Sequence, residues 1–393
     1  MRQPLLVVSL LACVALSEAS GCTGEPTEPY EVYAIAPDLQ GRHGIRRVQL
    51  PVHDPRTLAS DELAFEGRSG INIWLEGEGE SLRILGDTQD GVPIHLDLVQ
   101  EDGAYAAADH ESLIALSSAH HLLAARRYFD DLGLARFDPP FPRQRVVLFP
   151  SSISLPLGLT GRGPTSDNAF FADAIGGFAI LREVVLDSLP LATNQGVLTH
   201  EFAHAIFAHL TRHLPAAALG MPLATLLLPA LNEGLADIHA AAMTADPAFV
   251  AASVPSEADN RDLAVRRVYI KARAVPDGTG NPYWYGSIVA STFWSYRSRL
   301  VGERGLAEPE ARRRMGLVAF EGLRDMLAPT LPEIADKPFH TSDEVDAVLA
   351  RVEVEFWRAA AASAQSRGDK DIFCAAVVDH LAERPLVYEG ACP

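Results

Sequence analysis

The chain has 393 residues, of which 48% are hydrophobic and 21% are charged, and its formal net charge is −18 at pH 7. This composition is typical of a folded, soluble protein, excludes a disordered chain and allows for two domains. The acidic balance argues against a nucleic-acid partner, which would require a basic face.

The first 21 residues predict an export signal peptide. Arg2 supplies a positive charge, residues 5–16 are almost entirely apolar, and small residues precede Cys22. The apolar run is too short to span a bilayer comfortably. The segment resembles a bacterial lipoprotein signal, so we expect lipid on Cys22, a tether over residues 22–30 and membrane contact through this lipid only. Ala19 stands where such signals usually have leucine, so secretion after ordinary signal cleavage is the alternative.

The following residues predict an α+β fold. Residues 31–108 contain short apolar runs separated by Gly, Asp and Pro, which indicates a β-rich N-terminal lobe. Helical spacing begins after residue 109, so we expect an α+β subdomain at 109–245 and a mostly helical C-terminal subdomain at 246–393. The helices expected in the latter cover residues 261–273, 287–304, 309–326, 342–365 and 371–381.

The central motif is H-E-x-x-H, formed by His200, Glu201 and His204 in an apolar stretch. Residues four apart lie on one face of a helix, so both imidazoles can reach one metal ion, for which zinc is the expected identity. Glu201 would lie beside the metal, where its carboxylate can take a proton from an attacking water. Buried polar groups without partners are costly, which favours a metal site over a chance pattern.

A catalytic zinc needs a third protein ligand. The motif is not extended to a third histidine, because apolar residues occupy the positions that such an extension requires. Glu233, 29 residues after His204, lies in a second apolar stretch and is the candidate ligand. Asp237 follows one helical turn later, where it can accept a hydrogen bond from a ligating histidine, most simply His200. An exposed acidic pair is the alternative, which the apolar neighbours disfavour.

The sequences HEFAH at 200–204 and NEGLAD at 232–237 resemble the two zinc helices of the gluzincin metallopeptidases, particularly the thermolysin and fungalysin families. The resemblance covers about a third of the chain, roughly residues 167–300. It implies a zincin-like catalytic domain with Zn²⁺ held by His200, His204 and Glu233. It also implies that Glu201 is the general base and that Asp237 supports a ligand.

The segment Asn168-Ala169-Phe170-Phe171 is similar to the edge strand of these families. In those enzymes this strand holds the backbone of the substrate as an added strand. The resemblance therefore implies that Asn168 and Ala169 bind the substrate.

One departure concerns the group that stabilises the transition state. The related families carry a histidine shortly before the glycine of an active-site helix, whereas residues 281–294 contain that glycine, as Gly286, without the histidine. Tyr283 or Tyr285 can donate a hydroxyl to a developing oxyanion instead. The sequence leaves open which tyrosine serves, and whether either does more than pack.

The cysteines fit an exported chain. Of the four, Cys13 lies in the predicted signal and Cys22 is the predicted lipid site. The remaining two, Cys374 and Cys392, are expected to form a disulfide in an oxidising compartment. Two buried thiols are the alternative.

These features together predict a zinc metalloendopeptidase that hydrolyses a peptide or protein substrate. The missing histidine motivates an alternative, an exported zinc-containing binding or scaffold lipoprotein of the same fold without turnover.

Overall fold

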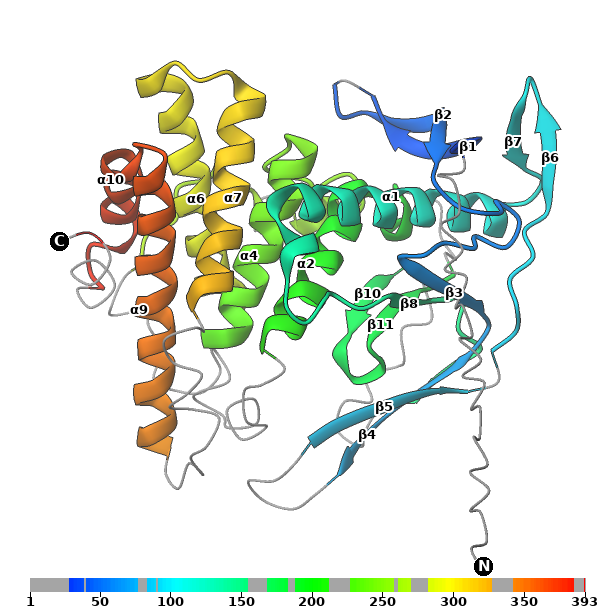
Figure 1. Ribbon diagram of the computed structural model, residues 1–393, viewed down its shortest axis with the longest axis horizontal. Helices are drawn as coiled ribbons and strands as arrows, with labels where there is room; N and C mark the ends of the chain where they lie inside the picture. The colour runs from blue at the N-terminus through cyan, green and yellow to red at the C-terminus, as the bar shows by residue number, and fades with distance from the viewer. Residues whose placement is uncertain are drawn as a thin grey trace, which may run out of the picture.

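The computed structural model describes residues 28–38, 40–76, 83–89, 91–154, 168–182, 188–211, 227–257, 261–269, 282–326, 342–384 and 392. The predicted α+β class is confirmed, with strands in the N-terminal part and helices in the C-terminal half. Figure 1 shows β-strands at one end of the molecule and α6, α7, α9 and α10 at the other, with α1 and α2 between them. Cys22 and the predicted signal and tether lie outside the described residues, apart from the last three tether positions.

The strands and helices have the following bounds. The strands are β1 (Tyr30–Pro37), β2 (His43–Leu50), β3 (Leu63–Gly67), β4 (Gly70–Glu76), β5 (Arg83–Gln89), β6 (Leu98–Glu101), β7 (Ala104–Ala107), β8 (Gln144–Leu148), β9 (Ser152–Ser154), β10 (Ala169–Ala172) and β11 (Gly177–Ile180). The helices are α1 (His110–Leu132), α2 (Gln195–Thr211), α4 (Leu227–Thr244), α6 (Pro282–Arg304), α7 (Glu308–Met326), α9 (Ser342–Ser366) and α10 (Lys370–Leu381).

The strands form sheets with the orders β2-β1-β7-β6, β10-β11-β8-β3 and β5-β4-β9. The predicted boundary after residue 108 coincides with the start of α1, but strand pairing crosses it. β3 pairs in parallel with β8, and β4 pairs in parallel with β9. The N-terminal β region therefore contributes strands to the sheets of the following region.

The long helix α1 has a well-defined start and end. Asp109 caps its first turn, because the side chain accepts a hydrogen bond from the backbone N–H of Ser112 at 2.7 Å. Gly133 ends it in the left-handed region, at φ 117°, where glycine carries no Cβ penalty. α1 packs against β1 on one side and α2 on the other.

His121 in α1 is fully buried, and its Nε2 lies 2.8 Å from the carbonyl oxygen of Ile35 in β1. Burial lowers the pKa of His121 from 6.5 to about 3. The folded protein thus keeps this ring neutral, whereas the unfolded chain binds a proton below pH 6.5. The free energy of unfolding is therefore unaffected by titration of His121 above pH 6.5. Between pH 6.5 and 3 it falls as the pH falls, because only the unfolded chain binds the proton.

We therefore expect the free energy of unfolding to fall more steeply on acidification in the wild type than in His121→Gln. Glutamine keeps a donor for Ile35 but does not titrate. Between pH 6 and 4 the difference in slope should approach about 1.4 kcal/mol per pH unit. Urea unfolding at several pH values measures both slopes, and equal slopes would show that His121 is not held neutral.

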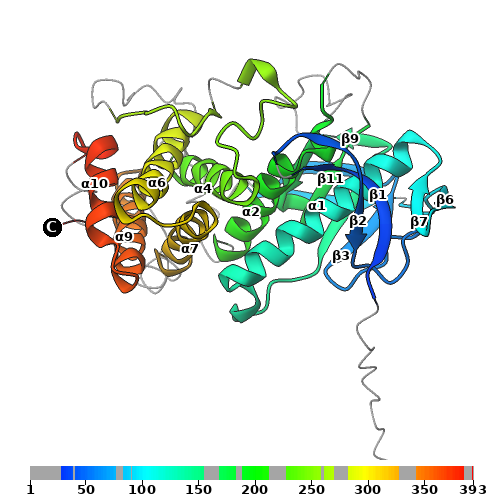
Figure 2. The ribbon, with the colours of Figure 1, turned by 90° about the horizontal axis from the view of Figure 1, so that it is seen from above.

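The helices follow one another from α1 through α2, α4 and α6 to α10, as Figure 2 shows, and each packs on the next. One hydrophobic cluster runs from β1 through all of these helices, so the two halves share a core. Among the described residues no helix is long and apolar enough to cross a membrane.

One predicted helix is wrong in its described part. Residues 262–269 of the expected helix 261–273 form a turn, a bend and irregular backbone, and residues 270–273 lie outside the described residues. Backbone N–H groups that would donate within a helix donate instead to residues outside this segment. The N–H of Leu263 donates to Pro247 and that of Tyr269 to His380. This segment, residues 261–269, is called the 261–269 segment below.

Candidate metal centre

The helix α2 carries the H-E-x-x-H motif into the interior. Asn194 caps its start, because its Oδ1 accepts hydrogen bonds from the N–H groups of Gly196 at 2.9 Å and Val197 at 3.4 Å. His200 is buried, and it forms with Glu201 and His204 a cluster able to hold a metal ion. The predicted motif residues are therefore brought together on one face of the helix.

Glu233 and Asp237 reach this cluster from α4. A Glu233 oxygen lies 3.4 Å from Nε2 of His200, and its other oxygen lies 3.7 Å from Nε2 of His204. An Asp237 oxygen lies 2.9 Å from Nδ1 of His200. Both carboxylates thus approach the histidines from one helix face.

The hydrogen bonds of the two imidazoles define which nitrogens face the centre. Nδ1 of His200 contacts the Asp237 carboxylate, and Nδ1 of His204 lies 2.8 Å from the side-chain oxygen of Asn232. In both rings Nδ1 is thus the outer nitrogen, held by a side chain from α4, and Nε2 is the inner one. These two Nε2 atoms are only 2.9 Å apart. Two imidazole nitrogens that face each other at this distance are an arrangement that suits binding of one metal ion.

The donor set fits zinc. Ligands bound at 2.0–2.1 Å in tetrahedral geometry are separated from one another by about 3.3 Å. The separations of 2.9, 3.4 and 3.7 Å between donors of His200, His204 and Glu233 bracket this value. In addition, Oε2 of Glu233 is buried without a hydrogen-bond partner among the described residues. A metal ion would satisfy this atom.

The electrostatics of His200 reflect its two carboxylate neighbours. Burial and the charge of Arg261 lower the pKa of His200, but its interactions with the Asp237 and Glu233 carboxylates outweigh them and raise it to about 9. Burial and the charge of His200 lower the pKa of His204.

Glu201 lies beside the two histidines and also contacts strand β10. Its Oε2 accepts a hydrogen bond from the backbone N–H of Phe171 at 2.7 Å. Among the described strands β10 is the outer one of its sheet, and its inner edge pairs with β11. Asn168 and Ala169, at the start of β10, line the same cavity as the motif residues. The general-base candidate and the predicted substrate strand are therefore adjacent.

The cavity has a volume of about 1480 Å³. The motif residues and the start of β10 form part of its wall, and α6 and the 261–269 segment form another part. Its apolar lining includes Val197, Phe207, Leu228, Phe249, Val254 and Ile288. Its size is sufficient for an extended peptide as well as for a small molecule.

Arg261 is a site residue that the sequence reasoning missed. Its guanidinium donates to Asp237 and lies 3.1 Å from Nδ1 of His200 and 3.6 Å from a Glu233 oxygen. The nearby Asp237 and Glu233 carboxylates outweigh burial and raise the pKa of Arg261, so it remains charged. Arg261 belongs to neither motif, and no spacing rule connects it with them.

The structure separates the two candidate tyrosines. Tyr283 lines the cavity, and the guanidinium carbon of Arg261 lies 5.3 Å from its ring centre. Burial and the charge of Glu233 raise its pKa, so the hydroxyl keeps its proton at neutral pH. Tyr285 is buried outside the cavity lining, and its hydroxyl donates to Glu353 on α9. Of the two, only Tyr283 is therefore in a position to meet a ligand.

Close packing of α4 against α6 fixes Glu233 relative to Tyr283. A Cβ on Gly234 would lie 2.7 Å from the carbonyl oxygen of Gly286, and a Cβ on Gly286 would lie 2.8 Å from that of Ala230. Only glycine at both positions permits this approach. The glycines next to Glu233 and Tyr285 in the sequence are thus explained by helix contact.

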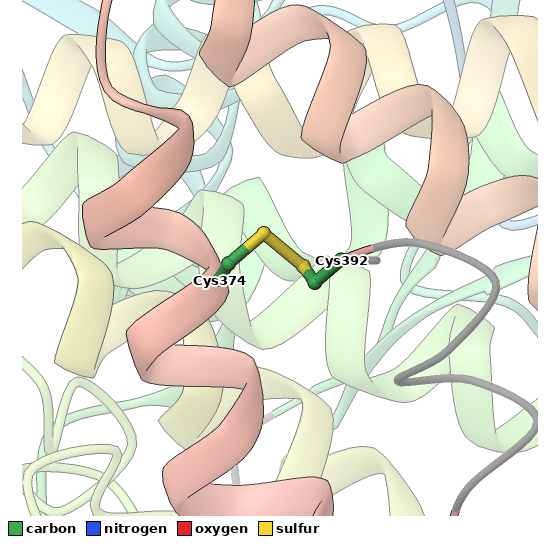
Figure 3. Close-up of a disulfide and its surroundings, with 2 residues drawn as sticks. All are labelled: Cys374 and Cys392. Atoms are coloured by element: carbon green, nitrogen blue, oxygen red, sulfur yellow. A yellow bond between two sulfur atoms is a disulfide. The ribbon is translucent and has the colours of Figure 1, made fainter.

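The predicted cysteine pair lies at the far end of the molecule from the β-strands. Cys374 on α10 and Cys392 form a disulfide with a Cα separation of 5.5 Å, as Figure 3 shows. The cluster His200, Glu201 and His204 contains no cysteine.

The chain matches no model of a known protein family, and no curated protein is significantly similar to it. Functional roles therefore rest on the contacts of the site itself.

Proposed function

We propose that the protein is a zinc hydrolase and, more specifically, a metalloendopeptidase of the gluzincin type. The observation that carries this proposal is the convergence of His200, His204 and Glu233, with both Nε2 atoms directed inward by their outer hydrogen bonds. Glu201 beside β10 adds a base next to a strand edge, which suits a peptide substrate.

In this proposal His200, His204 and Glu233 hold zinc. The bound ion would polarise the scissile carbonyl and make a water acidic enough to attack at neutral pH. Glu201 takes the proton of the attacking water and delivers it to the leaving amine. The outer edge of β10 receives the peptide backbone, with Asn168 and Ala169 as contacts.

Two side chains stabilise the negative charge that develops on the carbonyl oxygen. Tyr283 donates its hydroxyl, because its raised pKa keeps it protonated and it lines the cavity. Arg261 adds a fixed positive charge on the same wall. Arg261 also binds Asp237, so it stabilises the acceptor that orients His200.

For Tyr283→Phe we expect kcat to fall by about 10²-fold, with little change in KM and full zinc content, because only a transition-state contact is lost. Tyr105→Phe, in β7, is a control that should keep wild-type kinetics. Steady-state hydrolysis of a quenched fluorescent peptide measures both constants. Unchanged kcat in Tyr283→Phe would remove the hydroxyl from the mechanism.

The proposal is tested with purified full-length protein and unfolded casein, with and without a zinc chelator. We expect one zinc per chain and cleavage that the chelator abolishes and added zinc restores. Thermal destabilisation by the chelator without any cleavage would instead favour the zinc-containing binding or scaffold protein. Absence of zinc would contradict both functions.

We also propose that the chain is exported and anchored by lipid on Cys22, with secretion as the alternative. The disulfide between Cys374 and Cys392 supports export, because such bonds persist in oxidising compartments. Metabolic labelling with a radioactive fatty acid should mark the wild type and not Cys22→Ser. Label that persists in the variant would contradict anchoring at Cys22.

A further inference from the structure

Two elements bring Arg261 and Tyr283 to the cavity. Arg261 begins the 261–269 segment, which has no regular secondary structure beyond its first residue. Tyr283 stands in the first turn of α6. Neither element belongs to the helix pair α2 and α4 that carries the ligands. α6 packs on α4 and Arg261 contacts Asp237, and both elements also have contacts on the side away from the cavity.

Other residues of these two elements converge on one ion pair in the C-terminal part of the chain, in which Glu353 is buried and Arg384 is partly buried. Glu353 on α9 accepts a hydrogen bond from Tyr285, which stands two residues after Tyr283. The second oxygen of Glu353 binds the guanidinium of Arg384, just beyond α10. Arg384 donates in turn to the hydroxyl of Tyr269, at the end of the 261–269 segment, at 3.1 Å.

The pair is enclosed by aromatic rings. The guanidinium carbon of Arg384 lies 5.0 Å from the ring centres of both Tyr269 and Tyr285. Glu353 is only 1% exposed. Burying such a pair costs desolvation energy, and apolar residues of similar volume often stabilise a core equally well. A contribution to global stability is therefore a weak explanation for charges at this position.

The helix α10 adds a second connection to the 261–269 segment. The carbonyl oxygen of His380 accepts from the N–H of Tyr269 at 2.7 Å, and Nδ1 of His380 lies 2.5 Å from the carbonyl oxygen of Arg267. The disulfide ties Cys392 back to Cys374 on the same helix. Arg384 therefore lies within the stretch of chain that this disulfide closes covalently between residues 374 and 392.

We propose that Glu353 and Arg384 form a positioning pair that sets Tyr283 and Arg261 relative to the zinc ligands. Glu353 holds the first turn of α6 through Tyr285, and Arg384 holds the end of the 261–269 segment through Tyr269. The pair touches neither substrate nor metal. This inference rests on the proposed peptidase function and assigns a role in that reaction to residues outside the cavity.

The test compares Glu353→Gln with Glu321→Gln in the zinc-loaded, full-length protein. Glu321 on α7 forms a matched ion pair with Arg367, at 3.0 Å, outside the cavity lining and the 261–269 segment. We expect Glu353→Gln to lower kcat by about 10- to 100-fold, with KM changed less than about threefold and one zinc retained. Glu321→Gln should lower only the melting temperature.

A double-mutant cycle distinguishes positioning from general loosening. Tyr285→Phe removes the contact through which Glu353 holds α6, so its effect on kcat should not add to that of Glu353→Gln. Full additivity, or wild-type kcat in Glu353→Gln well below its melting temperature, would overturn the inference. If Glu353→Gln does not fold, Arg384→Lys, which keeps the charge and loses a donor, takes its place under the same criteria.

The two proposals fail in different ways. A wild-type protein that binds zinc but cleaves neither casein nor peptide contradicts the peptidase function, whatever the variants do. An active wild type with an equally active Glu353→Gln variant contradicts the positioning pair alone.

Discussion

Glu201→Gln is expected to lower the rate of peptide hydrolysis by about 10²- to 10⁴-fold while the protein keeps its zinc. Glutamine has the same shape, and its oxygen can still accept the hydrogen bond from the N–H of Phe171. It cannot take a proton from water at neutral pH. The variant therefore separates loss of the base from loss of the fold, because zinc content, melting temperature and structure should match the wild type.

The rate is measured with a quenched fluorescent peptide, and zinc is measured by elemental analysis of the same sample. Glu303→Gln on α6 is a matched control, since this side chain is 52% exposed and pairs with Arg299. It should keep wild-type kinetics. Retained turnover in Glu201→Gln would refute the proposed mechanism even if zinc is present.

The second large effect is expected on removal of two ligands. In the double variant His204→Ala, Glu233→Ala, His200 is the one proposed zinc ligand that remains. A single imidazole binds zinc too weakly to retain it in dilute solution. We expect zinc to fall from one per chain to below about 0.1 and hydrolysis to fall to background. The melting temperature of the double variant should no longer respond to added zinc or to a chelator. Zinc can raise the melting temperature only by binding to the folded state, and the variant has lost that binding.

A histidine on the same helix provides the control for this double variant. His209 lies in the last turn of α2, and its Nε2 is 3.3 Å from the carbonyl oxygen of Pro139. His209→Gln should keep one zinc per chain and wild-type activity. Zinc that survives the double substitution would show that the ligand assignment is incorrect.

The parts of the site that lie on single helices could be predicted from the sequence. The spacing of His200, His204 and the Glu233–Asp237 pair is local, and helical geometry converts it directly into a shared face. To bring the histidines of α2 close to the acidic pair of α4, one further assumption was needed, namely that the two helices pack together. The apolar residues around both motifs supplied it.

Arg261 and the two tyrosines could not be assigned in this way, because their positions depend on distant contacts. The 261–269 segment has a helical pattern of residues, but bonds to Pro247 and His380 hold it in another conformation. Tyr283 and Tyr285 are separated by a single residue, and their different environments follow from Glu353, which is 68 residues beyond Tyr285. No local pattern contains that information.

The parallel pairing of β3 with β8 constrains how the protein can mature. β3 pairs from Leu63 through Gly67 with β8, which in turn pairs with β11 and so supports β10 beside Glu201. If the residues before α1 were a propeptide, the protein that remains after cleavage would have to keep its fold. Removal of the residues before α1 would take β3 out of this sheet and expose the edge of β8. The N-terminal β region is therefore expected to be a permanent part of the folded protein and not an activation segment.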